Sequence, residues 1–180
     1  MNEIFDKALD EILILTTGGT IDKVYFDAKS SYEVGSSIVG SLLEQAEVRH
    51  PCKIVEVLQK DSLELNDQNR ALIRDTILDH AHRQIVITHG TDTMTQTASA
   101  IADCADRTIV LTGSLAPARF AMTDAMFNIG MALATVQSKE SGVYIVMNGT
   151  VFDANRVHKD KKKNAFIADP PGPARKGPEH

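Results

Sequence analysis

The sequence predicts an α/β fold: an open, mostly parallel sheet with helices on both faces. Five short apolar runs are predicted to be its strands, at residues 12–16, 53–58, 84–89, 108–112 and 142–147. These runs are apolar along nearly their whole length, and the segments between them carry helical spacing or capping residues. Strands of this kind, joined by helices, are typical of a parallel sheet that is buried on both sides.

The first connection is predicted to be a long loop followed by a helix. Residues 20–35 are polar and show no sustained periodicity, so we expect a loop there. Ser36 or Ser37 then caps a helix with a single apolar face. That face comprises Ile38, Leu42, Leu43 and Ala46.

Helices are also predicted between the later strands. Asn66 or Asp67 caps the second helix, residues 93–105 form a third that is rich in small side chains, and residues 124–136 form the fourth. The side chains expected to face the sheet are Leu72, Ile73, Ile77 and Leu78 in the second helix and Phe127, Met131 and Ala134 in the fourth.

Length and composition predict one domain with a tail. A chain of 180 residues and 19.6 kDa has the size of a single globular domain. From Asp169 onward the sequence DPPGPARKGPEH has almost nothing to bury, so its ordering entropy is not offset. We therefore expect one domain over residues 1–168 and a flexible Pro/Gly-rich tail over residues 169–180.

Charge and composition exclude several classes of partner. The formal net charge is −5, Trp is absent and aromatic residues make up 5%, which argues against nucleic acid as a partner. No apolar run approaches the roughly 20 residues that span a bilayer, and the opening MNEIFDKALDE is unlike a secretory signal. The only cysteines are Cys52 and Cys104. Together these features predict a cytoplasmic protein without membrane or nucleic-acid partners.

Polar residues gather where the predicted strands end. They form the segments 16–20 (TTGGT), 60–62 (KDS), 89–93 (HGTDT) and 112–114 (TGS), and beyond the fifth strand come NGT and then His158–Lys159. In open α/β sheets, ligands bind outside the carboxyl ends of the strands. The recurrence of hydroxyls, a carboxylate and lysines at these ends, most of them beside glycine, indicates an enzyme site.

No phosphate, metal or cofactor site is predicted. The Walker motif is absent, and Gly18–Gly19 leads into a loop rather than a helix, so these glycines are expected to turn the chain and to leave amide groups facing a small ligand. No cluster of His, Cys and carboxylate residues has the spacing of a metal site. His89, at the end of an apolar strand, is expected to be a hydrogen-bonded core residue.

The strand-end residues suggest a hydroxyl nucleophile. A threonine hydroxyl reacts only when a neighbouring base takes its proton, and the candidates are the phenol of Tyr25 or Tyr32 or a lysine–carboxylate pair. Thr91, Asp92 and Lys159 can supply a second hydroxyl, a carboxylate and an amine. In the alternative interpretation Asp92 and Thr93 are helix caps and Lys159 is a surface charge, and the residue types alone leave both open.

Five motifs together resemble the bacterial asparaginase/glutaminase family. They are TTGGTI (16–21), HGTDTM (89–94), VLTGSLAP (110–117), TDAMFN (123–128) and VMNGTVFD (146–153), and the likeness extends over nearly all of residues 11–167. The resemblance implies the α/β domain that comes first in that family. It also implies hydrolysis of L-asparagine to L-aspartate and ammonia through a threonine acyl-enzyme, without a metal or cofactor.

Site residues follow from the resemblance, motif by motif. It makes Thr20 the nucleophile and Thr91 the second hydroxyl, with Asp92 holding the substrate's amino group and Lys159 completing a Thr–Lys–Asp relay. The implied substrate-binding residues are Asp61, Ser62, Gly90 and Ser114. The tyrosine of the mobile loop is Tyr25 or Tyr32, because the shorter distance from Thr20 favours the former and the family spacing fits the latter.

The chain departs from the family pattern in two places. Ala116 stands where the family usually has an arginine, which Arg119 can replace. The family's second domain is missing, so we expect a short-chain member that closes its site as a homo-oligomer, a dimer or tetramer, through the apolar stretch 122–134; a truncated chain is the other explanation. The alternative functions are a non-catalytic binder of asparagine or aspartate and an amide-hydrolysing subunit of an amidotransferase.

Overall fold

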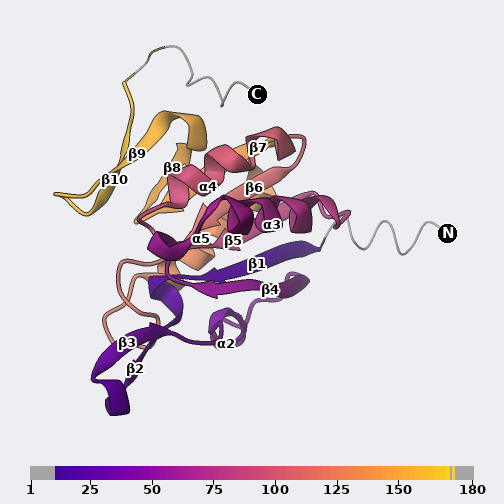
Figure 1. Cartoon of the computed structure of the whole chain (residues 1–180). Coiled ribbons are helices and arrows are strands. Elements are labelled where there is room, and N and C mark those ends of the chain that lie inside the picture. Colours follow the sequence, from indigo (N-terminus) through magenta and orange to yellow (C-terminus); the bar gives the residue numbers. More distant parts are fainter. Residues whose placement is uncertain (1–10, 171, 173–180) are drawn as a thin grey trace.

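The protein is built on a six-stranded sheet whose five predicted strands are confirmed (Figure 1). The computed structural model describes residues 11–170 and residue 172. In spatial order the strands are β4 (Cys52–Lys60), β1 (Ile12–Gly18), β5 (Gln84–Thr88), β6 (Thr108–Thr112), β7 (Gly142–Met147) and β8 (Thr150–Asp153). The first five are parallel, and β8 pairs with β7 in the antiparallel direction.

Helices cover both faces of this sheet, as predicted. One apolar cluster joins the sheet to α3 (Asp67–Leu78) and α4 (Met94–Ala100), and a second joins it to α2 (Val39–Gln45) and α5 (Ala125–Ser138). Successive residues of β1 alternate between the two clusters, because side chains of a strand point to opposite faces. The inner strands β1, β5 and β6 are therefore buried on both sides, which explains their continuous apolar runs.

The predicted inward faces of three helices need correction. In α3, Ile73 and Ile77 are fully buried, but Leu72 and Leu78 are each 46% exposed. In α2, Leu42 and Leu43 are buried, whereas Ala46 is exposed at the helix end. The predicted stripe of α5, Phe127, Met131 and Ala134, is wrong: Phe127 and Ala134 are exposed and Met131 is half-buried.

The orientation of α5 has a specific cause. Its polar Asn128 points inward, where its side-chain amide donates to Gly113 O at 2.9 Å and to Asp124 Oδ2 at 2.8 Å. These bonds turn the face with Ile129 and Leu133 towards the sheet. Because the helix is apolar over most of its surface, its sequence alone did not identify this face.

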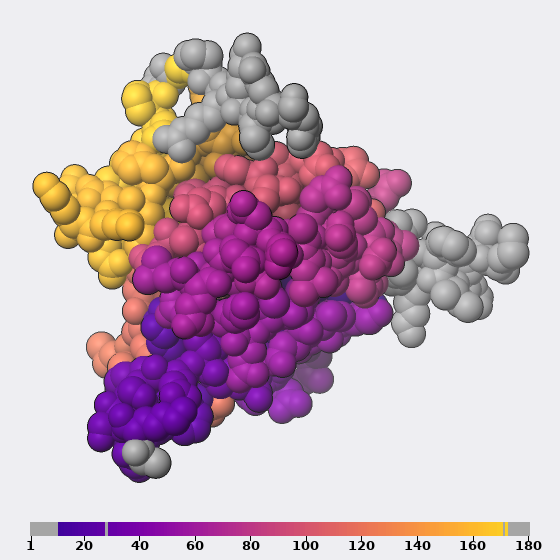
Figure 2. Space-filling model, viewed as in Figure 1, coloured from indigo at the N-terminus to yellow at the C-terminus, as the bar shows by residue number. Residues whose placement is uncertain are grey.

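Two β-hairpins at the carboxyl edge of the sheet were not predicted. The segment expected as a loop forms β2 (Lys23–Phe26) and β3 (Ser31–Val34), in which Tyr25 lies opposite Tyr32. The second hairpin pairs β9 (Val157–Asp160) with β10 (Ala165–Ala168). Figure 2 shows the two hairpins as separate projections on one side of the molecule.

Short 3-10 turns complete the fold. They are η1 (Thr20–Asp22), η2 (Asp27–Lys29), η3 (Ser62–Glu64), η4 (Ala102–Cys104) and η5 (Ala154–Arg156). Helix α4 ends at Ala100, and η4 takes up most of the rest of the predicted helix 93–105. Most of the predicted tail, 169–180, lies outside the described residues, as do residues 1–10.

The strand order fixes where a ligand can bind. From β1 the chain continues to β4 on one side of it and then to β5 on the other side. At such a switch point the connections leave in opposite directions, and a crevice opens at the carboxyl ends of the two central strands. The two central strands are β1 and β5. Thr20 lies in the segment that follows β1, and Thr91 lies in the segment that follows β5.

Candidate active site

The loops that follow β1, β4 and β5 touch one another at glycine residues. A Cβ on Gly19 would lie 2.4 Å from the main-chain N of Gly90, and a Cβ on Gly90 would lie 2.6 Å from Ser62 Oγ. Gly19 also has a φ of 87°, which side-chain-bearing residues rarely adopt. The two glycines therefore allow a close contact between the loops, and Thr20 and Thr91 are the residues that follow them.

One expectation for the glycine pair is wrong. The N–H of Gly19 does not face a ligand, because it donates to the main-chain oxygen of Lys60 at 2.9 Å. This bond ties the loop after β1 to the end of β4. The glycine thus serves the packing of the site rather than the binding of a ligand through its amide.

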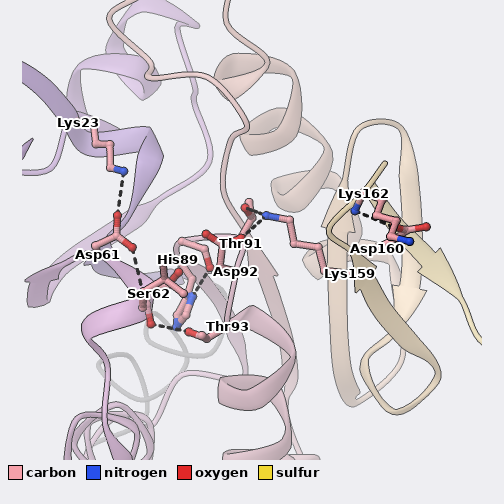
Figure 3. Close-up of polar contacts among 12 residues, drawn as sticks. Lys23, Asp61, Ser62, His89, Thr91, Asp92, Thr93, Lys159, Asp160 and Lys162 are labelled. Carbon is pink, nitrogen blue, oxygen red and sulfur yellow. Dashed lines mark hydrogen bonds and ion pairs between the residues drawn. The ribbon is translucent and has the colours of Figure 1, made fainter. Parts of the chain in front are cut away.

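Thr91, Asp92 and Lys159 form a compact polar cluster (Figure 3). Lys159 reaches from β9 and donates to Thr91 Oγ1 and to Asp92 Oδ1, each at 2.6 Å. The Lys159 side chain is only 8% exposed, so it is not a surface charge. Thr93 does hold the N-cap position of α4, as the alternative interpretation expected, but it makes no side-chain capping bond, because its hydroxyl donates to Ser62 O at 2.7 Å.

Asp61 lies on the side of Thr91 and Asp92 that is away from Lys159 (Figure 3). It has a partner that the sequence analysis missed. Lys23, the first residue of β2, lies 2.8 Å from Asp61 Oδ2, and Leu63 N donates to Asp61 Oδ1 at 3.1 Å. Burial opposes ionisation of Asp61, but these two bonds outweigh it and lower the pKa of the carboxyl. Lys23 and Asp61 are 38 positions apart, and no sequence signal links them.

A cleft opens beside Asp61. It has a volume of about 520 Å³ and lies between the β2–β3 hairpin and the end of β4. Its lining includes Lys23, Tyr32, Lys60, Asp61 and Glu64, so charges of both signs face it. A small zwitterionic molecule matches this mixture of charges.

Both candidate tyrosines lie on the hairpin and contact each other. The Tyr25 and Tyr32 rings have centroids 5.1 Å apart, and Tyr32 also meets Phe120 edge to face at 5.8 Å. Tyr25 is 48% exposed and Tyr32 is 50% exposed. Only Tyr32 is among the residues that line the cleft, but Tyr25 contacts it, and both remain candidates for the mobile loop.

Asp124 holds the loop that follows β6, where Ser114 lies. Burial opposes its ionisation, but the bonds it accepts outweigh this and lower the pKa of the Asp124 carboxyl. The donors are the main-chain N–H groups of Leu115 and Ala116 and the side-chain amides of Asn128 and Asn148. The Ser114 hydroxyl is buried and donates to Ala116 O at 2.6 Å. Arg119 is exposed; burial raises the pKa of the Asp22 carboxyl, and the positive charge of Arg119 opposes this shift without outweighing it.

His89 is a hydrogen-bonded core residue, as expected. It is fully buried; Nδ1–H donates to Gly90 O at 2.7 Å, and Nε2 accepts from Thr97 Oγ1 at 2.8 Å. Burial lowers the pKa of His89 to about 4; the bond to Gly90 opposes this shift, and the positive Arg70 adds to it. His89 is therefore neutral at pH 7 and acts as a structural support below the Gly90–Thr91 loop.

Acidification should destabilise the fold through His89. The unfolded chain takes up this proton near pH 6.5 and the folded chain only near pH 4, so stability falls as the pH drops between these values. We expect this group alone to lower the free energy of unfolding by about 2 kcal/mol between pH 7 and pH 5. Urea unfolding at several pH values measures this.

Other groups act outside this window or in the opposite direction. The lowered pKa values of Asp61, Asp103 and Asp124 reduce stability only below about pH 4. Burial raises the pKa of Asp22, so protonation of this group on acidification stabilises the folded state. A free energy of unfolding that stays constant from pH 7 to pH 5 would contradict the role assigned to His89.

The described part of the chain contains neither a candidate metal site nor a candidate membrane span. Among residues 11–170 and 172, no group of three or more His, Cys, Asp and Glu side chains is arranged to hold a metal ion. In the same residues, no helix has the length and apolarity needed to cross a membrane.

The fold and these contacts define a class: an α/β protein with a candidate hydroxyl-based site at the switch point of its sheet. Residues 11–173 match the family model described as "Asparaginase, N-terminal". The chain belongs to the asparaginase family.

Individual relatives support this assignment. The chain is 34% identical over 165 residues to L-asparaginase 2 of Escherichia coli (strain K12), a match that covers 84% of this chain and 47% of the relative. It is 31% identical over 169 residues to the glutaminase-asparaginase of Pseudomonas fluorescens biotype A, covering 84% and 46%. The structure of the thermostable L-asparaginase from Thermococcus kodakarensis superposes with a TM-score of 0.76 at 28% identity, covering 88% and 51%. The chain thus spans about half the length of the relatives it matches.

Proposed function

We propose that this chain hydrolyses the side-chain amide of L-asparagine to L-aspartate and ammonia. The observation that carries the proposal is the double contact of Lys159 with Thr91 and Asp92, each at 2.6 Å, across 68 and 67 positions of sequence. A nearly buried lysine between a hydroxyl and a carboxylate is suited to proton transfer. Membership of the asparaginase family supports an amide as the substrate.

The chemistry proceeds in two steps through an ester on Thr20. The Thr20 hydroxyl attacks the amide carbon, its proton passes to the relay of Thr91, Lys159 and Asp92, and the tetrahedral intermediate expels the amide nitrogen, which leaves with that proton as ammonia. Water then attacks the ester carbon, which releases aspartate and restores the Thr20 hydroxyl. No metal or cofactor takes part in this scheme.

Charged groups around the site fit an amino-acid substrate. Asp92 is assigned to the substrate's ammonium group, and Asp61 and Ser62 are assigned to its α-carboxylate and amino end, where Lys23 supplies a positive charge beside Asp61. Gly90 and Ser114 complete the proposed binding residues through the loops that they shape. Tyr25 or Tyr32 closes the site from the hairpin, and the two Tyr→Phe variants compared side by side distinguish them.

Ammonia release tests the proposal. Purified protein is incubated with L-asparagine and, in parallel, with L-glutamine, because one relative is named a glutaminase-asparaginase. We expect ammonia from asparagine, and less from glutamine, well above the level of a Thr20→Ala control. Release equal to that control, together with measurable asparagine binding, would replace the hydrolase with a non-catalytic binder.

We also propose that the chain assembles as a homo-oligomer, a dimer or tetramer. Met122 is 90% exposed and Phe127 is 58% exposed on the surface formed by the loop before α5 and the start of that helix. Two large, exposed apolar side chains five positions apart in the sequence favour an interface. A second copy is the expected partner, because closed symmetric assemblies are the commonest kind.

Light scattering tests the assembly. The wild-type mass should be two or four times 19.6 kDa, and a Met122→Asp, Phe127→Asp double variant should have the mass of one chain. Leu72→Asp is the matched control, since Leu72 is a 46% exposed leucine on α3 and its replacement should leave the mass unchanged. A monomeric wild type would refute the assembly.

A further inference from the structure

Asp22 is a charged side chain in an unusually buried position. It is 2% exposed and lies in η1, two residues after Thr20. Its Oδ1 accepts a hydrogen bond from Ile38 N at 2.9 Å, whereas Oδ2 is buried without a hydrogen-bond partner among the described residues. A buried carboxylate is costly, so its presence requires an explanation beyond packing.

The contacts of Asp22 join both ends of the β2–β3 hairpin. Lys23, the next residue, begins β2, while Gly35 directly follows β3 and donates its N–H to the main-chain oxygen of Asp22 at 2.9 Å. Ile38, bound to the carboxylate, lies three residues further along this exit from the hairpin. A single residue therefore connects the strand that enters the hairpin to the segment that leaves it.

The same residue also closes the turn that contains Thr20. The Asp22 N–H donates to Gly19 O at 3.2 Å, and the neighbouring Ile21 O accepts from Ala118 N at 3.1 Å. Thr20 is thus enclosed between Gly19, which is packed against Gly90, and Asp22, which is bound to the base of the hairpin. Any shift of Asp22 changes the position of Thr20 relative to the hairpin.

We propose that Asp22 is a positioning residue, which fixes the hairpin carrying Tyr25 and Tyr32 relative to the segment carrying Thr20. Its role in catalysis rests on the proposed function, but its role in holding the hairpin does not. The carboxylate touches no reacting atom in this scheme; it acts through Ile38 and the turn. Because the unpaired Oδ2 costs stability, we attribute the burial of this carboxylate to its role in the contacts that connect the hairpin to the turn. We call these contacts of Asp22 with Gly19, Gly35 and Ile38 the joint.

The charge of Asp22 couples this joint to pH. An ionised carboxylate accepts a stronger hydrogen bond than a neutral carboxyl group, so protonation should loosen the joint. Three groups face Asp22 from the surrounding elements: Ser37 from the segment before α2, Glu56 from β4 and Arg119 from the loop after β6. Burial raises the pKa of Asp22; the bond from Ile38 N and the nearby Ser37 hydroxyl oppose this, Glu56 adds to it and Arg119 opposes it.

Amide hydrogen exchange of residues 23–34 tests the joint without any need for turnover. Asp22→Ala should raise exchange in the hairpin about 10-fold or more, because local opening becomes easier. Asp22→Asn keeps an acceptor for Ile38 N and should stay within about 3-fold of wild type. Asp27→Asn is the matched control: it removes one exposed carboxylate from the same hairpin and should leave exchange unchanged.

Kinetics test the catalytic part of the proposal. A displacement of about 1 Å can lower turnover about 100-fold, so Asp22→Ala should lower kcat by 10- to 100-fold while KM changes less than about 3-fold. Asp22→Asn removes the same charge that protonation removes, so it should lower kcat about 3-fold at neutral pH and lose the matching ionisation from the acid side of the kcat profile. A merely structural residue would not produce this difference between the two variants.

Ile38→Pro serves as an independent probe should Asp22→Ala fold poorly. It removes the N–H donor at a residue whose φ of −92° is near the range of proline, and it should loosen the hairpin as Asp22→Ala does. If the hairpin amides of Asp22→Ala and of Ile38→Pro both exchange at the wild-type rate, the proposal is overturned. If the wild type releases no ammonia but Asp22→Ala loosens the hairpin, the proposed function fails and the joint stands.

Discussion

Thr20→Ala and Lys159→Met are each expected to lower kcat for asparagine hydrolysis by about three to five orders of magnitude, with much smaller changes in KM. The first change removes the proposed nucleophile. The second removes the amine that contacts both Thr91 and Asp92 at 2.6 Å, so the proton of the attacking hydroxyl loses its route to the leaving nitrogen. Steady-state ammonia release on matched preparations measures both effects.

Thr91→Val should resemble Lys159→Met, because the two residues act as one relay in the proposed mechanism. Groups that act together lose their effect together, so the Lys159→Met, Thr91→Val double variant should be scarcely slower than either single variant. Lys162→Met is the matched control: it removes an exposed lysine from the same hairpin and should leave kcat within about 2-fold. A Thr20→Ala protein that keeps most of its activity while Thr91→Val is inactive would transfer the role of nucleophile to Thr91.

The strands of the central sheet were predictable because burial leaves a simple pattern. Strands β1, β5, β6 and β7 are apolar through most of their length, since helices cover both faces of the sheet. The β2–β3 hairpin leaves no such pattern. It is partly or fully exposed along both strands, and its pairing brings Tyr25 opposite Tyr32 rather than burying a continuous apolar face. Sequence periodicity reflects burial, and little of the β2–β3 hairpin is buried.

The candidate site was predictable only in part, for a similar reason. Thr91 and Asp92 are neighbours in one motif, but their partner Lys159 lies at the far end of the chain, and only the family resemblance connected it to them. No comparable likeness pointed to Lys23 as the partner of Asp61. Contacts between residues distant in sequence depend on the topology of the chain, which composition and spacing do not contain.

Gly19→Ala is expected to have the second large effect, on both stability and activity. The added Cβ would lie 2.4 Å from Gly90 N and 2.5 Å from Gly90 Cα, both main-chain atoms that no side-chain rotation can move away. The φ of 87° adds backbone strain. Together, overpacking and strain should lower the free energy of unfolding by about 3–5 kcal/mol.

Gly130→Ala provides the matched control, because it makes the same chemical change inside helix α5. A Cβ at Gly130 meets nothing within 4 Å, so alanine should raise the free energy of unfolding by about 0.5–1 kcal/mol through its higher helix propensity. Urea unfolding of the two variants, with kcat measured on the fraction that remains folded, compares them directly. The folded Gly19→Ala protein should lose about 100-fold in kcat, because relieving the clash separates the loops that carry Thr20 and Thr91. A Gly19→Ala protein as stable and active as Gly130→Ala would show that the close contact of the two glycines does not set the geometry of the site.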